Sequence, residues 1–112
     1  MARWRARNPL RAIFKSKRSS ARRRGIPFAI RFEDIRWPER CPALGTPLDY
    51  RVNLGHKRDP RTVPSFDRVN NDEGYVPGNV QIISNAANKI KNQFTAAEIR
   101  RVADWLELVA SD

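Results

Sequence analysis

The chain has 112 residues, a length typical of one domain with a single modest core, and its hydrophobic fraction of 40% argues against a disordered polypeptide. No apolar run approaches the ~20 residues that a membrane-spanning helix needs, and the basic N-terminus lacks the apolar segment of a secretory signal, so we expect a cytoplasmic protein without a membrane partner. Cys41 is the only cysteine, which excludes an internal disulfide and the paired cysteines of a structural zinc site.

The positive charge lies in the N-terminal third of the chain. Residues 1–40 hold 13 Lys and Arg against 3 Asp and Glu, a net charge of +10, whereas residues 41–112 hold 9 of each sign. A segment this basic attracts a polyanion, because each phosphate that it neutralises releases counterions. We therefore interpret residues 1–40 as a nucleic-acid-binding segment of the same domain. A solvated tail and a surface for an acidic protein are the alternatives.

Residues 9–24 are predicted to form a helix, because Pro9 suits a first turn and apolar residues recur near one face. Gly25 and Pro27 are typical of a helix end. A short strand is expected over residues 28–32. The basic side chains that we expect to contact nucleic acid lie on the helix or at its end: Lys15, Lys17, Arg18, Arg22, Arg23 and Arg24.

The middle of the chain carries few periodic signals. Residues 33–40 are expected to form a turn or a short helix, and residues 41–50 a loop with two prolines and a glycine. Residues 51–63 are polar and lack a period, which favours an exposed loop. His56, the only histidine, lies in that loop.

The remaining chain carries clearer signals. Residues 65–69 alternate in the manner of a strand, and residues 80–83 form a second strand candidate after turn residues. Ser84 is expected to cap a helix that runs through Asn92.

A C-terminal helix is predicted from Thr95, because Thr95 and Glu98 have the spacing of a capping box. We expect its apolar stripe to pack on the core. We also assign two tryptophans, Trp37 and Trp105, to the core. The stripe consists of Ile99, Val102, Ala103, Leu106 and Val109.

Residues 64–92 hold groups that suit a divalent cation. The carboxylate of Asp67 and the amide oxygen of Asn88 are hard ligands of the kind that Mg²⁺ takes, together with water and substrate phosphate. Lys91 lies three residues after Asn88 on the same side of the helix, where a cation helps to hold a phosphate. Alternatively, Asp67 is a turn carboxylate paired with an arginine, and Asn88 is an ordinary surface amide.

Residues 64–92 resemble the ββα-metal motif of the HNH, or His-Me finger, endonucleases, and residues 21–106 are similar to small phage-associated HNH proteins. The likeness lies in the stretches ARRRGIPF, CPALGTPLDY, PSFDRVNNDEGYVPGNVQIIS and NAANKIKN. This resemblance implies an α+β fold with a ββα-metal core in residues 41–112, an N-terminal basic helix and a C-terminal amphipathic helix. It also implies Mg²⁺ or Mn²⁺ as cofactor, and a bacterial host cytoplasm if the protein is phage-encoded.

The resemblance also implies roles for individual residues. Asp67 and Asn88 correspond to metal ligands, Asn79 to a residue that braces the loop between the strands, and Lys91 to a phosphate contact. Arg68 stands where family members usually carry a histidine general base. An arginine stays protonated and cannot take a proton from water, although it can bind a phosphate oxygen and stabilise charge in the transition state.

Three routes for activating water stay open. His56 acts as the base; the metal activates water while Arg68 holds the phosphate; or nothing activates water and the domain only binds. The expected catalytic residues are Asp67, Arg68, Asn79, Asn88 and His56. We predict a divalent-metal-dependent DNA endonuclease, with nicking and double-strand cutting both open.

Two other functions remain as alternatives. One is a catalytically inactive HNH-fold module that binds nucleic acid, and the other is a component of a phage or mobile-element assembly. DNA is favoured over RNA as the partner. The oligomeric state is open: a homodimer is compatible with the sequence, although no interface pattern demands one.

Overall fold

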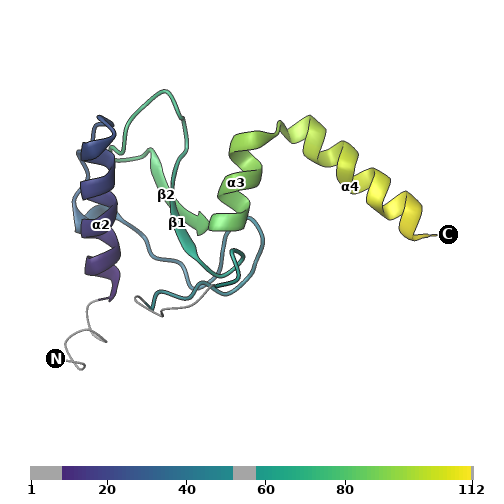
Figure 1. Ribbon diagram of the computed structural model, residues 1–112, viewed down its shortest axis with the longest axis horizontal. Coiled ribbons are helices and arrows are strands. Elements are labelled where there is room, and N and C mark those ends of the chain that lie inside the picture. The colour runs from purple at the N-terminus through teal and green to yellow at the C-terminus, as the bar shows by residue number, and fades with distance from the viewer. Residues whose placement is uncertain (1–8, 52–57, 112) are drawn as a thin grey trace.

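The computed structural model describes residues 9–51 and 58–111 (Figure 1). This part of the chain is a mixed α and β protein, and none of its helices combines the length and hydrophobicity that crossing a membrane requires. His56 lies outside the described residues. In chain order the elements are α2 (Pro9–Arg23), the 3-10 helix η1 (Phe32–Asp34), β1 (Pro64–Arg68), β2 (Val80–Ser84), α3 (Asn85–Gln93) and α4 (Ala96–Ala110).

Helix α2 forms where the sequence predicts it. Phe14 and Ala21, two turns apart, are buried on its inner face. The helix ends because Gly25 adopts a φ of 71°, in the left-handed region that glycine enters without strain. The chain then turns back, and the Ile26 N–H donates to the carbonyl of Ala21 at 2.9 Å. The expected helix over residues 9–24 is therefore confirmed.

The strand expected over residues 28–32 is wrong. Phe28 forms a single parallel bridge with Tyr75, and no longer ladder follows. Instead the carboxylate of Asp34 accepts a hydrogen bond from the Arg31 N–H at 2.8 Å and closes the turn of η1. The alternating apolar residues here pack on the core from an irregular segment, because among the described residues the backbone bridge is limited to the Phe28–Tyr75 pair.

Strands β1 and β2 form a two-stranded antiparallel sheet, with a register that runs from the Pro64–Ser84 pair to the Arg68–Val80 pair. Helix α3 starts directly after β2, where the Ser84 hydroxyl accepts a hydrogen bond from the Ala87 N–H at 3.1 Å. Helix α3 packs against both strands. Both predicted strands and the Ser84 cap are thus confirmed to within a residue or two.

One continuous core joins α2 to the sheet. Its aromatic rings form a chain in which Phe14 contacts Phe32, Phe32 contacts Trp37, and Trp37 contacts Phe66 of β1, each pair with a centroid separation of 5.8 Å. Trp37 packs against the core, as expected. Residues 9–40 therefore fold together with the residues that follow them. Cys41 is buried in the same core, where its Sγ accepts a hydrogen bond from the Ser84 N–H.

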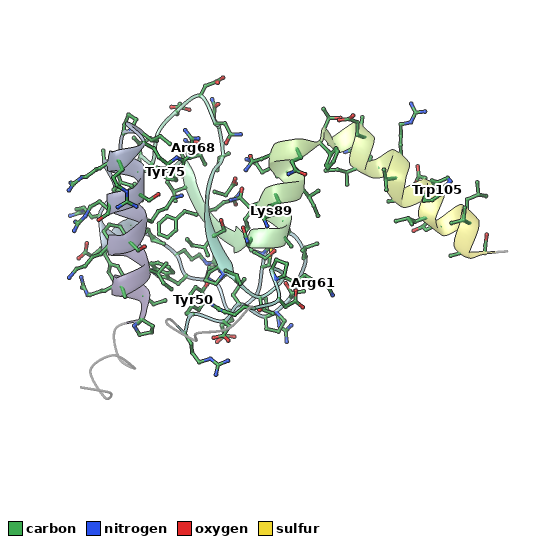
Figure 2. The ribbon with its side chains drawn as sticks, in the orientation of Figure 1. Tyr50, Arg61, Arg68, Tyr75, Lys89 and Trp105 are labelled. Carbon is green, nitrogen blue, oxygen red and sulfur yellow. The ribbon has the colours of Figure 1, made fainter. Side chains whose placement is uncertain are left out.

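The expected packing of the C-terminal helix on the core is wrong. Helix α4 extends away from the rest of the molecule (Figure 1), and all of its residues are exposed. Trp105, expected in the core, is 59% exposed on this helix (Figure 2). The reason is the two-residue connection: Phe94 and Thr95 both have extended backbones, which directs α4 outward. The capping box of Thr95 and Glu98 is present as predicted.

Candidate functional site

Asp67 is a buried carboxylate held from two sides. Its side chain is 1% exposed, although it belongs to a strand of a small sheet. Gln81, its register partner on β2, donates from Nε2 to Oδ2 at 3.0 Å. Lys91 of α3 donates from Nζ to Oδ1 at 2.9 Å. A buried carboxylate needs such partners, because its desolvation otherwise opposes folding.

Lys91 pairs with this carboxylate and does not line the pocket described below. Its Nζ also donates to the backbone carbonyl of Arg68 at 2.9 Å. The Lys91 ammonium group pairs with Asp67, and 36% of the side chain is exposed to solvent. A second cation arriving at Asp67 therefore competes with Lys91.

Asn88 belongs to a chain of amides that crosses the site. Its Nδ2 donates to the Ser65 hydroxyl of β1 at 2.8 Å, and its Oδ1 accepts from Asn92 Nδ2 at 2.9 Å. Asn92 in turn accepts from Asn71 Nδ2 at 3.1 Å, which links α3 to the loop between the strands. The sequence reasoning missed the contribution of Asn71. The pairing of Asn88 with Asn92 was predictable, because residues four apart lie on the same face of a helix.

Asn79 holds the loop between β1 and β2. It is buried, and its Oδ1 accepts from the Asn70 N–H at 2.8 Å. Its Nδ2 donates to the carbonyls of Asn70 and Gly74 at 3.1 and 2.9 Å. All of these bonds go to backbone atoms of the loop, so Asn79 shapes the wall of the site without lining the pocket.

Two cations lie against one aromatic ring. Arg68 of β1 has its guanidinium 5.4 Å from the centroid of the Tyr75 ring, and Lys17 of α2 has its Nζ 5.0 Å from the same centroid. Figure 2 shows Arg68 and Tyr75 together beside α2. Arg68 also donates to the backbone carbonyls of Asn71 and Glu73 at 3.1 and 3.2 Å. Within the described part of the chain, neither cation forms an ion pair with a carboxylate.

These groups surround one pocket of about 240 Å³ between α2, β1, the loop between the strands, and α3. Three of its lining side chains are cationic and one is acidic, which favours an anionic ligand. The lining residues are Lys17, Arg24, Phe66, Asp67, Arg68, Asn71, Tyr75, Asn88 and Asn92. The structure thus brings five of the expected site residues together: Lys17, Arg24, Asp67, Arg68 and Asn88.

The other expected nucleic-acid contacts lie elsewhere on α2. Arg22 and Arg23 are exposed on its last turn and do not line the pocket. Lys15 and Arg18 line a separate hollow, and Arg18 lies 5.7 Å from the centroid of the Phe14 ring. These four basic side chains therefore add positive charge to α2 outside the pocket.

Asp67 and Asn88 are the pocket residues whose oxygens could hold a Mg²⁺ ion. Mg²⁺ takes one or two carboxylates and completes its octahedron with water or substrate phosphate. Asp67 would provide the carboxylate and Asn88 an amide oxygen, in competition with the hydrogen bonds from Lys91 and Asn92. Comparison of the chain with models of protein families, with curated proteins and with solved structures finds no match, so the pocket geometry carries the functional argument.

Proposed function

We propose that the protein is a divalent-metal-dependent endonuclease that hydrolyses phosphodiester bonds in DNA, with β1, β2 and α3 as a ββα-metal core. The observation that carries this proposal is the composition of the pocket. A buried carboxylate, Asp67, lines this pocket together with three cations, Lys17, Arg24 and Arg68. An acid that can hold a metal beside cations that can hold a phosphate is the arrangement that metal-assisted phosphodiester hydrolysis needs.

The cations supply the phosphate contacts. Arg68 presents a planar fork that matches a phosphate, and its contacts with two loop carbonyls fix the direction of that fork. Lys17 adds a second positive charge from α2 across the same Tyr75 ring. Since no carboxylate neutralises either side chain within the described residues, both charges are available to a DNA strand.

Asp67 and the amide oxygen of Asn88 would hold Mg²⁺ or Mn²⁺. When bound, the ion supplies the charge that polarises the scissile phosphate and stabilises the leaving oxygen. Lys91 donates to Oδ1 of Asp67, so a metal ion at that oxygen would compete with the Lys91 ammonium group. Its partly exposed, flexible side chain can turn toward the phosphate, which is the role that the resemblance implies.

His56 lies outside the described residues, so this proposal assigns it no role. Arg68 stays protonated and cannot take a proton from water, and we propose that it holds the phosphate instead. Without a positioned base, hydrolysis should be slow, which suits nicking.

The ion pair between Lys91 and Asp67 favours a second candidate function. It satisfies the buried carboxylate with a side chain of the protein itself. The second candidate is a catalytically inactive module that binds DNA through the same cations. The two candidates share the basic surface and differ only in whether a metal displaces Lys91.

Nicking of supercoiled plasmid in Mg²⁺ or Mn²⁺ separates the two candidates. We expect the wild type to nick, and Asp67→Asn, which keeps the size of the side chain, to lose at least about 100-fold in rate with DNA affinity nearly unchanged. The matched control is Asp72→Asn, an exposed acid of the loop, which should nick normally. A wild type that binds DNA without nicking would establish the binding module instead.

A further inference from the structure

Helix α4 carries an apolar stripe that is exposed along its length. Four residues of the stripe are spaced three, four and three apart, the pattern of core positions in a two-helix coiled coil. These are Ile99, Val102, Leu106 and Val109, with exposed fractions of 38%, 56%, 52% and 45%. A helix with such a stripe buries it against another element, because propensity alone rarely stabilises 15 residues in water.

We propose that α4 is the interface of a homodimer, in which it packs antiparallel against α4 of a second copy of this chain. The two-fold axis passes near the middle of the helix, so Ile99 lies opposite the partner's Val109 and Val102 opposite the partner's Leu106. The same surface serves both copies, as in most homodimers. This proposal does not depend on the nuclease activity.

Small residues beside the stripe allow a close approach of the two helices. Ala96, Ala103 and Ala110 recur every seven residues along one side of the stripe. In the antiparallel register, Ala96 lies opposite the partner's Ala110, and Ala103 opposite the partner's Ala103. Without long side chains on this side, the two backbones can come closer together and bury more of the stripe.

Charge complementarity selects the second copy and its direction. Arg100 and Glu107 lie just outside the alanines, seven residues apart, and neither forms an ion pair within the described part of the chain. In the antiparallel register Arg100 lies opposite the partner's Glu107, and symmetry repeats the pair. A parallel pairing would place Arg100 and the partner's Glu107 on opposite sides of the coiled coil and would lose both ion pairs.

The interface continues beyond α4 at its N-terminal end. An apolar hollow of about 320 Å³ lies at the junction of α3 and α4, lined mainly by Ile90, Phe94, Ile99 and Val102. The partner's Val109 lies opposite this hollow in the proposed register. Two helices of 15 residues alone form a small interface, so the hollow adds needed area, and we expect a dissociation constant on the order of micromolar.

Sedimentation of the full chain over about 1–100 µM tests the dimer, since that range brackets the affinity expected of a small interface. We expect the wild type to change from monomer to dimer, and Leu106→Lys to stay monomeric throughout. The matched control is Leu108→Lys, because Leu108 is 68% exposed but lies off the stripe, and it should dimerise normally. Both side chains are exposed in the monomer, so folding should survive in both variants, as circular dichroism can verify.

A charge exchange tests the direction of the helices. Arg100→Glu should weaken the dimer about fivefold, because it creates two like-charge contacts, and adding Glu107→Arg should restore the wild-type affinity. A double variant as weak as the single one would overturn the antiparallel register.

Three results would overturn the dimer itself. The first is a wild type that stays monomeric while acrylamide fails to quench the fluorescence of Trp105. The Trp105→Phe variant identifies the Trp105 share of the fluorescence. This result would show that α4 folds back on its own chain. The second is a monomer with Trp105 accessible, which would leave the stripe to a different partner. The third is a dimer that survives Leu106→Lys, which would place the interface elsewhere.

Discussion

Helices α3 and α4 begin with the same local signals and have opposite surroundings. Each has a hydroxyl residue as its N-cap, Ser84 for α3 and Thr95 for α4, and each has an apolar face. Helix α3 packs on both strands, whereas every residue of α4 is exposed. Capping residues and apolar periodicity therefore specify a helix and its apolar face, but they do not specify which surface packs against that face.

The same comparison separates two kinds of function. The part from α2 to α3 holds the pocket and its cations, and we propose that it binds and cleaves DNA. Helix α4 carries two arginines and three acids, so its charge nearly cancels, and we propose that it binds a second copy of the chain. Substitutions in the two regions should therefore have different effects, which the following experiments measure.

The largest expected difference is in folding stability. Ile82→Ala removes a side chain of β2 that is 2% exposed, and we expect the free energy of unfolding to fall by about 2–5 kcal/mol. Leu108→Ala also truncates an aliphatic side chain, on α4, and should change the free energy of unfolding by less than about 0.5 kcal/mol. Urea titration measures both. Equal losses would show that α4 packs on the core after all.

A methyl group at Gly74 should disturb both the fold and the pocket. Its Cβ would lie 2.6 Å from the carbonyl oxygen of Pro27 and 2.8 Å from its Cβ, so the bridge between Phe28 and Tyr75 must shift. We expect Gly74→Ala to lower stability by about 1–3 kcal/mol and to weaken DNA binding through Tyr75. Gly78→Ala, where the added group meets open space but φ is +84°, should lower stability with normal DNA binding.

Neighbouring arginines should differ in their contribution to DNA binding. Arg24 lines the pocket and Arg22 does not, although both are exposed at the end of α2. Arg24→Gln should lower the slope of log affinity against log salt by about 1, as expected when one phosphate contact is lost. Arg22→Gln should have a smaller effect. Fluorescence anisotropy at several salt concentrations measures both slopes. Identical slopes would argue that the DNA contacts the pocket residue Arg24 no more closely than Arg22.

The smallest effect should be confined to α4. Thr95 accepts a hydrogen bond from the Glu98 N–H at 3.1 Å, so Thr95→Ala should remove about 1 kcal/mol of helix stability. We expect lower helicity by circular dichroism and an unchanged melting temperature for the part from α2 to α3. A fall in that melting temperature would mean that α4 supports the core.

The pH dependence of the same cap follows from Glu98. The backbone N–H of Thr95 donates to the Glu98 carboxylate at 2.9 Å, and this hydrogen bond lowers the pKa of Glu98. A lowered pKa means that the stabilisation is present above the ordinary pKa and is lost as the pH falls through the folded-state value. Helicity of α4 should therefore decline below about pH 4.5 in the wild type but not in Glu98→Gln.

Local features of the fold were predictable because nearby side chains cause them. The caps at Ser84 and Thr95 and the helix end at Gly25 each depend on one or two adjacent residues. Strands β1 and β2 were predictable because alternation and turn residues bracket them. The strand expected over residues 28–32 was wrong because its bridge partner among the described residues, Tyr75, is more than 40 residues away in the sequence and pairs with Phe28 alone.

The candidate site was predictable in its residue types and less so in its contacts. The chemistry of their side chains and the family resemblance predicted Asp67 and Asn88 as metal ligands, and the structure brings both residues to one pocket. The pairing of Lys91 with Asp67 spans 24 positions and depends on how α3 lies against β1. Lys17 and Arg68 reach the Tyr75 ring from separate elements, so no local sequence pattern predicted that the two cations lie together.

We propose that Asp67 and Asn88 hold a divalent cation beside a bound phosphate. A crystal grown with a short DNA duplex and Mn²⁺, with anomalous diffraction collected, tests it most directly. We predict one Mn²⁺ about 2.0–2.2 Å from the Asp67 carboxylate, with Lys91 moved off Oδ1 toward the DNA. Bound DNA with no Mn²⁺ at Asp67, and with the Lys91–Asp67 ion pair intact, would contradict it.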